Sequence, residues 1–202
     1  MKIYKTPRFL RLIFKQRTWG FSLDENCVYL TFDDGPHPDI TPWVLDELQK
    51  HDVRATFFCV GENVRRYPEI YQRIISEGHA VGNHTMQHEN ALKVKSSDYI
   101  KSIAEASEWI DSKLFRPPYG RLTPVLASKI RKTYTIVMWS WLSYDFDKTV
   151  PVSQILEKAG KQIKRGDILV LHDNPKITER QKELLPELLK ILEGKKLKSR
   201  IL

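Results

Sequence analysis

Short apolar runs alternate with amphipathic stretches along most of this chain. The apolar runs are typical of buried strands, and we expect strands at 28–32, 55–61, 79–84, 134–141 and 167–173, and a strand that leads into a turn over 114–120. Of these predicted strands, the one at 134–141 has the clearest pattern. Between the runs, apolar residues recur at helical spacing, as at Val44, Leu45 and Leu48. This spacing predicts helices over 42–52, 67–78, 96–110, 123–131, 152–163 and 179–193.

The alternation of strand and helix predicts a parallel sheet with right-handed crossovers, either open or closed into a barrel. Chemically unusual residues stand at the C-terminal ends of the predicted strands: Asp33, Asp34, His84, Arg116, Asp145 and His172. This is the edge at which parallel α/β folds assemble their active sites. With about seven strands and no dinucleotide-type glycine fingerprint, the chain predicts an α/β fold with a deformed or incomplete (β/α) barrel.

Length and composition are those of one globular domain, with 202 residues, 41% of them hydrophobic and 29% charged. We expect a basic N-terminal lead segment over residues 1–26 and one catalytic domain over residues 27–202. Cys27 and Cys59 are too few for a disulfide framework, and Cys59, within an apolar run, is predicted to be a buried thiol. No apolar stretch approaches the about eighteen residues of a membrane span. Neither a transmembrane helix nor a clear signal peptide is expected, so we predict a cytoplasmic or membrane-peripheral monomer.

The formal net charge is +8, and part of the excess lies at the N-terminus, in Lys2, Lys5, Arg8, Arg11, Lys15 and Arg17. Apolar residues are interspersed with these cations. The segment therefore suits either peripheral contact with an anionic membrane surface or packing under the first strand, and both interpretations stay open. Nucleic-acid binding is not expected, because no stacking-aromatic or recognition-helix motif accompanies the charge.

Two motifs carry the candidate chemistry. LTFDDGPHP places Asp33 and Asp34 side by side, and GNHTMQH places His84 and His88 four residues apart. A carboxylate with two imidazoles is a ligand set that suits zinc or another borderline divalent ion. A second carboxylate beside that set can serve as a base, so the pattern predicts a metal-dependent hydrolase. Both aspartates reach one site only at a bent strand end, and Gly35 with Pro36 supplies the bend.

Together with FRPPY at 115–119 and LVLHD at 169–173, these motifs resemble those of NodB-like polysaccharide deacetylases, carbohydrate esterase family 4. TFDDGP, H-T-x-x-H, R-P-P-Y and L-x-x-H occur in the family's order, from about residue 27 to the C-terminus. The resemblance implies that Asp33 is the general base and that Asp34, His84 and His88 bind one divalent metal ion. Zinc is expected, with cobalt, nickel or manganese as alternatives.

The resemblance also implies roles for the later motifs. Arg116 corresponds to the arginine that orients the catalytic aspartate, a role suited to a guanidinium that can hold a carboxylate bidentately. Pro118 and Tyr119 correspond to the substrate and oxyanion side of the site, where the Tyr119 backbone amide faces the oxyanion. His172 corresponds to the general acid, because the pKa of imidazole lies near neutral pH.

The fourth family motif is only partly kept. The usual pattern W-S-V-D-x-x-D-W is here WSWLSYDF. Asp145 matches the aspartate that partners the catalytic histidine. Leu142 stands where the first aspartate would be, and Phe146 replaces the tryptophan that lines the acetyl pocket.

The predicted activity is metal-dependent removal of acetyl from an N-acetyl amino sugar in a polysaccharide or glycan, which releases acetate and a free amine. An N-acetylated glycan is the expected partner. The first alternative is a deacetylase or deformylase of a lipid-linked amino sugar, which the basic N-terminus would suit. The second is a non-catalytic carbohydrate-binding relative, supported by the altered fourth motif alone.

Overall fold

The computed structural model describes residues 2–21 and 26–202. Its strands are β1 (Cys27–Asp33), β2 (Thr56–Cys59), β3 (Ala80–Asn83), β4 (Leu114–Phe115), β5 (Thr135–Ile136), β6 (Trp141–Leu142), β7 (Ile168–His172) and β8 (Lys198–Ser199). Its helices are α1 (Arg8–Ile13), α2 (Thr41–Lys50), α3 (Gly61–Arg66), α4 (Pro68–Ser76), α5 (Ser96–Ser107), α6 (Pro124–Ile130), α7 (Val152–Gln162) and α8 (Thr178–Gly194). Two short 3₁₀ turns are η1 (Pro118–Gly120) and η2 (Pro175–Ile177).

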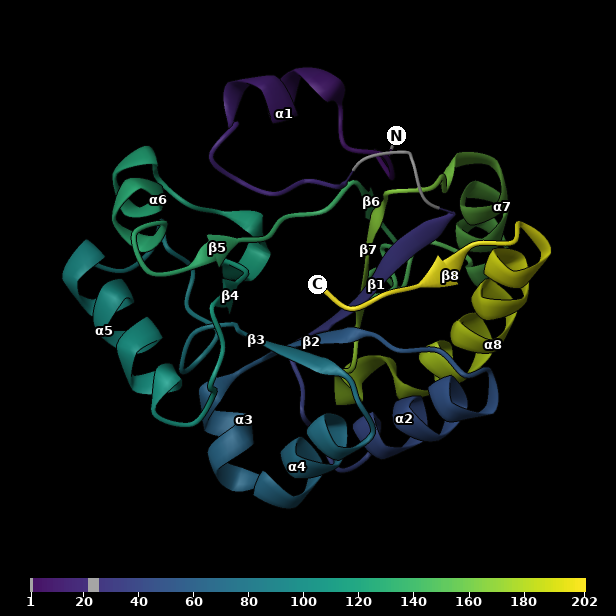
Figure 1. Cartoon of the computed structure of the whole chain (residues 1–202), viewed down its shortest axis with the longest axis horizontal. Coiled ribbons are helices and arrows are strands. Elements are labelled where there is room, and N and C mark those ends of the chain that lie inside the picture. The colour runs from purple at the N-terminus through teal and green to yellow at the C-terminus, as the bar shows by residue number, and fades with distance from the viewer. Residues whose placement is uncertain (1, 22–25) are drawn as a thin grey trace.

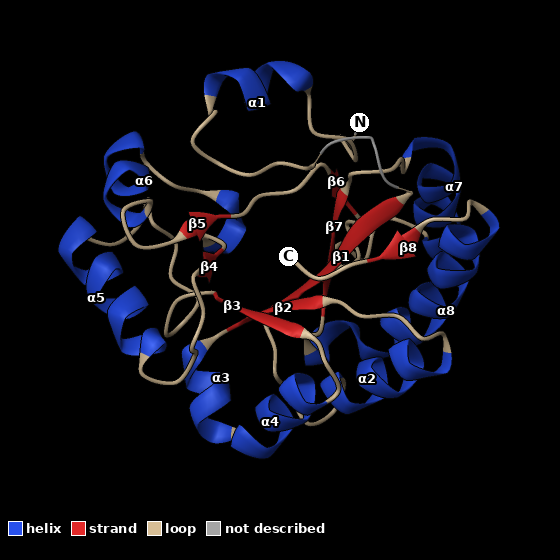
Figure 2. Cartoon of the chain, viewed as in Figure 1, coloured by secondary structure: helices blue, strands red, loops and turns tan. Residues whose placement is uncertain are grey.

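Seven parallel strands form a curled sheet in the order β5-β4-β3-β2-β1-β7-β6, and β8 pairs with β1 outside that path. Helices α2 to α8 surround the sheet on its outer side (Figure 1), and the strands line the interior (Figure 2). The predicted α/β class with an incomplete barrel is confirmed. Among the described residues, no helix combines the length and the apolar character needed to cross a membrane.

The alternation of side chains along β1 separates the core from the barrel interior. Val28, Leu30 and Phe32 are fully buried and pack into the large apolar cluster shared with α2 and α8. Alternate residues of a strand point to opposite faces, so Thr31 and Asp33 face the interior instead. The core therefore holds β1 rigidly from outside while its polar residues are presented inside.

The prediction of one continuous strand over 134–141 is wrong for the middle of that range. Only its two ends are strands, β5 and β6, and they lie at opposite edges of the sheet. The chain between them crosses the open side of the barrel, where the Val137 amide donates to Phe115 O (2.8 Å) and the Met138 amide donates to Thr18 O (2.7 Å). A largely apolar run indicates that its residues are buried. Val137 and Met138 are buried by several neighbouring segments and not by pairing with one strand.

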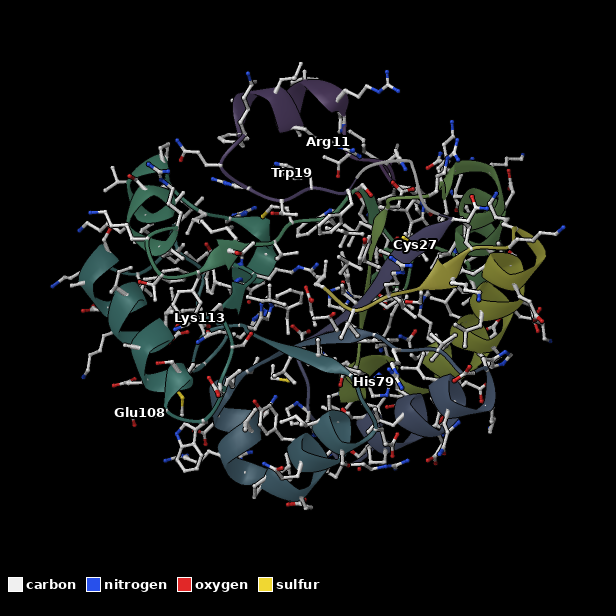
Figure 3. The ribbon with its side chains drawn as sticks, in the orientation of Figure 1. Arg11, Trp19, Cys27, His79, Glu108 and Lys113 are labelled. Atoms are coloured by element: carbon white, nitrogen blue, oxygen red, sulfur yellow. The ribbon has the colours of Figure 1, made fainter. Side chains whose placement is uncertain are left out.

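The N-terminal segment completes this open side. Leu142 N donates to Tyr4 O (2.9 Å) beside β6, and Thr18 N donates to Ile136 O (2.8 Å) beside β5. Buried Trp19 lies between α1 and the barrel (Figure 3), whereas no residue of α1 itself is buried. The residues before and after α1 thus pack against residues 136–142 more than under β1, where one interpretation predicted them. The α1 helix between them is exposed. Residues 1 and 22–25 of the predicted lead segment lie outside the described residues, and the boundary at 26–27 stays a prediction.

Candidate metal centre and active site

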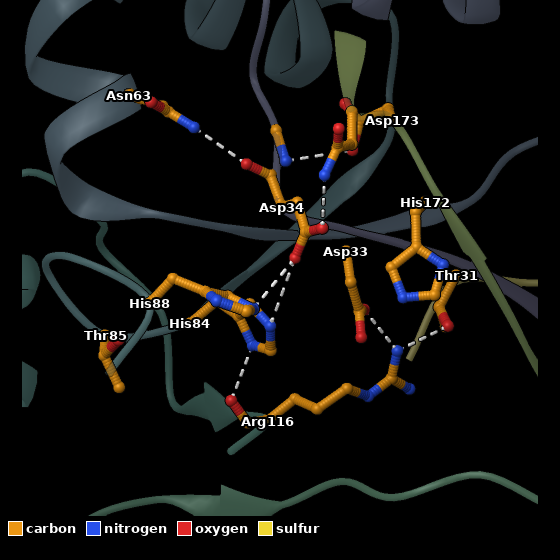
Figure 4. Close-up of polar contacts among 12 residues, drawn as sticks. Thr31, Asp33, Asp34, Asn63, His84, Thr85, His88, Arg116, His172 and Asp173 are labelled. Atoms are coloured by element: carbon orange, nitrogen blue, oxygen red, sulfur yellow. Dashed lines mark hydrogen bonds and ion pairs between the residues drawn. The ribbon is translucent and has the colours of Figure 1, made fainter. Parts of the chain in front are cut away.

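The parallel register brings the candidate residues to one edge of the sheet. Asp33 at the end of β1 is in register with His172 at the end of β7, and β3 and β4 end just before His84 and Arg116. Figure 4 shows that Asp33, His84, Arg116 and His172 surround one common space. The predicted location of the site, at the strand C-terminal ends, agrees with this arrangement.

Asp34, His84 and His88 form a compact group of potential metal ligands. One ligand atom from each lies within 4.8 Å of the others. The Nε2 atoms of His88 and His84 are 3.1 Å and 3.7 Å from Oδ1 of Asp34. Asp34 has a φ of 86°, so the chain turns at this residue and directs its carboxylate toward the two imidazoles, as Figure 4 shows.

The protonation of this group fits a divalent metal ion. His84 Nδ1 lies 2.7 Å from Arg116 O, which directs the Nε2 lone pair toward Asp34. Burial lowers the pKa of His84 to about 4, so the imidazole is neutral, as a ligand must be. Burial raises the pKa of Asp34, but His88, His172 and His84 outweigh it and lower that pKa well below its ordinary value. An ionised carboxylate beside neutral imidazole is the donor chemistry of a borderline divalent ion.

Asp33 is held by a fully buried arginine. Arg116 Nη1 donates to Asp33 Oδ1 (2.6 Å) and to Thr31 Oγ1 (2.7 Å), and Nη2 donates to Met138 O (3.1 Å). The guanidinium also lies 4.0 Å from the centroid of the Phe58 ring. The ion pair with Asp33 uses a single nitrogen, and the guanidinium is shared among several acceptors. One carboxylate oxygen of Asp33 is fixed by this contact.

His172 is held by Asp145 through two contacts. His172 Nδ1 lies 2.7 Å from Asp145 Oδ1, and the His172 amide donates to Asp145 Oδ2 (2.8 Å). Burial lowers the pKa of His172, but the Asp145 carboxylate, with Asp34 and Asp33, outweighs burial and raises that pKa to about 10. His172 is therefore protonated at neutral pH, and its Nε2 is the nitrogen not engaged by Asp145.

Two exposed aromatic rings border the site. Tyr119, 60% exposed, meets His88 edge-on with ring centroids 4.7 Å apart, and Phe146, 49% exposed, meets His172 edge-on at 5.2 Å. Pro118 is buried in η1 next to Tyr119, which has a φ of 60°. Leu142 is half-buried in β6, in register with Val170 of β7.

Three polar residues near Asp34 escaped the sequence analysis. Asn63 on α3 donates to the Asp34 carbonyl oxygen (2.8 Å), and Asn174 donates to Asp34 Oδ2 (3.0 Å). Asp173 Oδ1 accepts from the Gly35 amide (3.0 Å). The position of Asp173 and Asn174 directly after His172 was a usable signal. Asn63 offered none, because α3 itself was not predicted.

Comparison with known proteins places these features in one family. Residues 22–136 match the sequence profile of the family described as polysaccharide deacetylase. The chain is 36% identical over 163 residues to a peptidoglycan-N-acetylglucosamine deacetylase of Bacillus cereus, covering 77% of this chain and 76% of the relative. It is 37% identical over 173 residues to a chitooligosaccharide deacetylase of Bradyrhizobium sp., covering 82% and 78%.

A solved structure agrees over almost the whole chain. It is a peptidoglycan N-acetylglucosamine deacetylase in complex with 4-naphthalen-1-yl-N-oxidanyl-benzamide. It is 30% identical and superposes with a TM-score of 0.88 over 98% of this chain and 95% of the other. The barrel and its N-terminal segment are therefore both included in the likeness.

Proposed function

The chain belongs to the polysaccharide deacetylase family and is a metal-dependent carbohydrate N-deacetylase, and we propose that it deacetylates N-acetylglucosamine in peptidoglycan or chitooligosaccharides. The observation that carries this proposal is the Asp34, His84 and His88 group standing beside Asp33, at the strand ends where His172 also lies. The relatives named above act on those two glycans, which supports the choice of sugar. Zinc is the metal we propose, because two imidazoles and one carboxylate suit it, with cobalt, nickel or manganese as alternatives.

We assign the roles of the residues from their contacts. Asp34, His84 and His88 would hold a divalent metal, which would supply Lewis-acid polarisation of the amide carbonyl and acidify water. Asp33, with one oxygen fixed by Arg116, accepts the proton of the attacking water through its other oxygen. The chain's own donors then complete the reaction.

His172 is the proposed general acid. Its Nδ1 is engaged by Asp145, so Nε2 donates the proton to the leaving amine as the amide bond breaks. The Tyr119 backbone amide, in the left-handed turn next to Pro118, is assigned to the developing oxyanion. Phe146 borders the acetyl group. The products are acetate and a free amino sugar.

Acetate release from a defined substrate panel tests this proposal. The panel contains chitin oligomers, peptidoglycan fragments and lipid-linked N-acetyl and N-formyl sugars, each with and without a chelator. We expect chelator-sensitive turnover of the first two classes. Turnover confined to the lipid-linked sugars would favour the alternative deacetylase or deformylase. A non-catalytic glycan binder is disfavoured, because a binder needs neither Asp33 held by Arg116 nor His172 held by Asp145.

We also propose that the N-terminal segment contacts an anionic membrane surface. Residues 2–21 contain six basic residues and no acidic one. Lys2 and Lys5 pair with acidic side chains of the barrel, and Arg17 is buried. The cations on or next to α1 are therefore Arg8, Arg11 and Lys15. The α1 helix has no buried residue, and Phe9, Leu12 and Ile13 on it are 59%, 66% and 65% exposed. Apolar side chains among cations are the composition that binds the interface of an anionic bilayer.

Vesicle co-sedimentation tests this contact. We expect binding to phosphatidylglycerol vesicles, weakened by salt, and little binding to phosphatidylcholine vesicles. Replacing Phe9 and Leu12 by glutamate should abolish binding, whereas Val125→Glu on α6, where the valine is 62% exposed, should leave it unchanged. Equal binding by all three proteins would contradict the role of α1, and no binding by the wild type would contradict membrane contact itself.

A further inference from the structure

Asp34 has a backbone conformation that its surroundings must impose. Its φ of 86° lies in the left-handed region, which residues with a Cβ rarely adopt. Such a conformation persists only where neighbouring groups over-determine it. The neighbours that do so here come from α3 and from the turn after β7.

The backbone on both sides of the Asp34 carboxylate is held. The Asn63 side chain donates to the Asp34 carbonyl oxygen (2.8 Å), and the Gly35 amide donates to Asp173 Oδ1 (3.0 Å). A Cβ on Gly35 would stand 2.0 Å from Asp173 Oδ2, so this approach is open only to glycine. These contacts fix where the Asp34 side chain begins, but they do not fix the rotation of its carboxylate.

Asn174 fixes that rotation. Its Nδ2 donates to Asp34 Oδ2 (3.0 Å), while Oδ1 of Asp34 faces Nε2 of His88 (3.1 Å) and of His84 (3.7 Å). The torsion that turns a carboxylate about its Cβ–Cγ bond is broad, so a free Asp34 would sample many orientations. A donor on one oxygen selects the orientation in which the other oxygen faces the imidazoles.

The side chain of Asn174 performs a second task at its other end. Its Oδ1 accepts from the Lys176 amide (2.9 Å) and so caps the η2 turn. Because the oxygen is used in the turn, the NH₂ group is directed at Asp34. Aspartate at this position would cap the turn but place a second carboxylate against Asp34, and serine would cap it without reaching Asp34.

We propose that Asn174 is a positioning residue of the metal site, which holds Asp34 Oδ2 so that the carboxylate binds the metal through Oδ1 alone. The inference rests on the metal site of the proposed function and concerns a residue outside the ligand set. Partners of metal ligands typically contribute about 10- to 100-fold to metal affinity, because they fix the ligand's orientation before the metal arrives.

Asn174→Ser provides the test, since serine keeps an oxygen to cap η2 and removes the donor to Asp34. Zn²⁺ and Co²⁺ dissociation constants are measured by competition with a chromophoric chelator, and the unfolding midpoint of the metal-free protein is measured alongside. We expect dissociation constants about 10- to 100-fold larger with an unchanged midpoint. The visible spectrum of the Co²⁺ protein should also change, because the freed carboxylate can offer both oxygens.

The matched control is Asn26→Ser, an exposed asparagine next to the opposite end of β1, which should bind both metals as the wild type does. Asn174→Thr, which also keeps a capping hydroxyl, provides a second variant if the serine protein is unstable. Wild-type dissociation constants and Co²⁺ spectrum in a folded Asn174 variant would overturn the inference. A wild-type protein that binds neither metal would instead overturn the proposed function, so the two failures are distinguishable.

Discussion

Replacing Asp145 by asparagine should shift the alkaline limb of the pH–rate profile to lower pH. Asp145 favours the protonated form of His172, whose pKa is raised to about 10. Asparagine keeps one oxygen that can accept from Nδ1, but it removes the charge and places an NH₂ group where Asp145 Oδ2 accepted from the His172 amide. An opposite charge in contact contributes about 1 to 3 pKa units, or about 1.4 to 4 kcal/mol between the two protonation states. The limb should therefore move from near pH 10 to between about pH 7 and pH 9.

The expected loss depends on pH in a way that identifies its cause. With a pKa of about 10, His172 is about nine-tenths protonated at pH 9. With a pKa of about 8 it would be only about one-tenth protonated, so kcat/KM should fall about tenfold at pH 9 from protonation alone. At pH 6 both forms are protonated, and this part of the loss should vanish.

The assay is acetate release from a chitin oligomer between pH 5 and pH 10.5, with metal content measured at each end of the range. An alkaline limb that stays in place in a folded, metal-loaded variant would refute the role of the Asp145 charge. A uniform loss at every pH would mean that Asp145 acts only by orienting the imidazole, because a change of orientation does not alter the protonated fraction.

The remaining predictions concern the base, the metal ligands and the acid. Asp33→Asn should keep its metal by elemental analysis and lose about 10²- to 10⁴-fold in acetate release, the usual contribution of a general base; near-native turnover would contradict the division of roles between the two aspartates. Joint replacement of Asp34, His84 and His88 by alanine should remove the bound metal while circular dichroism remains that of a folded protein, and unchanged metal content would exclude these ligands. His172→Ala should slow amide hydrolysis far more than hydrolysis of an activated aryl acetate, whose leaving group needs no proton. Equal losses on both substrates would assign His172 to the shape of the site.

Local pattern was sufficient to predict most elements of the fold. Helices such as α5 and α7 bury one stripe of side chains, and a stripe leaves a spacing that can be recognised in the sequence. Thr123 accepts from the Leu126 amide (3.2 Å), as expected of a residue that caps a helix. The range 134–141 was predicted wrongly, because it is mostly apolar but leaves one edge of the sheet and joins the other.

The sequence by itself determined the chemical repertoire of the site. Asp33, Asp34, His84 and His88 are recognisable because their types and spacings are local properties of the chain, and strand ends in a parallel sheet share one edge. The family resemblance assigned Asp34 to the imidazoles, but the oxygen through which it faces them was decided only in three dimensions.

Tertiary structure also decided the partners of these residues. The strand register sets Asp33 against His172, and Arg116 contacts Asp33 through one nitrogen. Asn63 and Asn174 donate to Asp34. Each of these contacts joins segments that are far apart in the chain. The pattern of apolar residues indicates which face of a helix or strand is buried, but it does not indicate which residues that face contacts. Differences of a few tenths of an ångström in donor–acceptor distance select hydrogen-bond partners, and those distances are set only after the strands have paired and the core has packed.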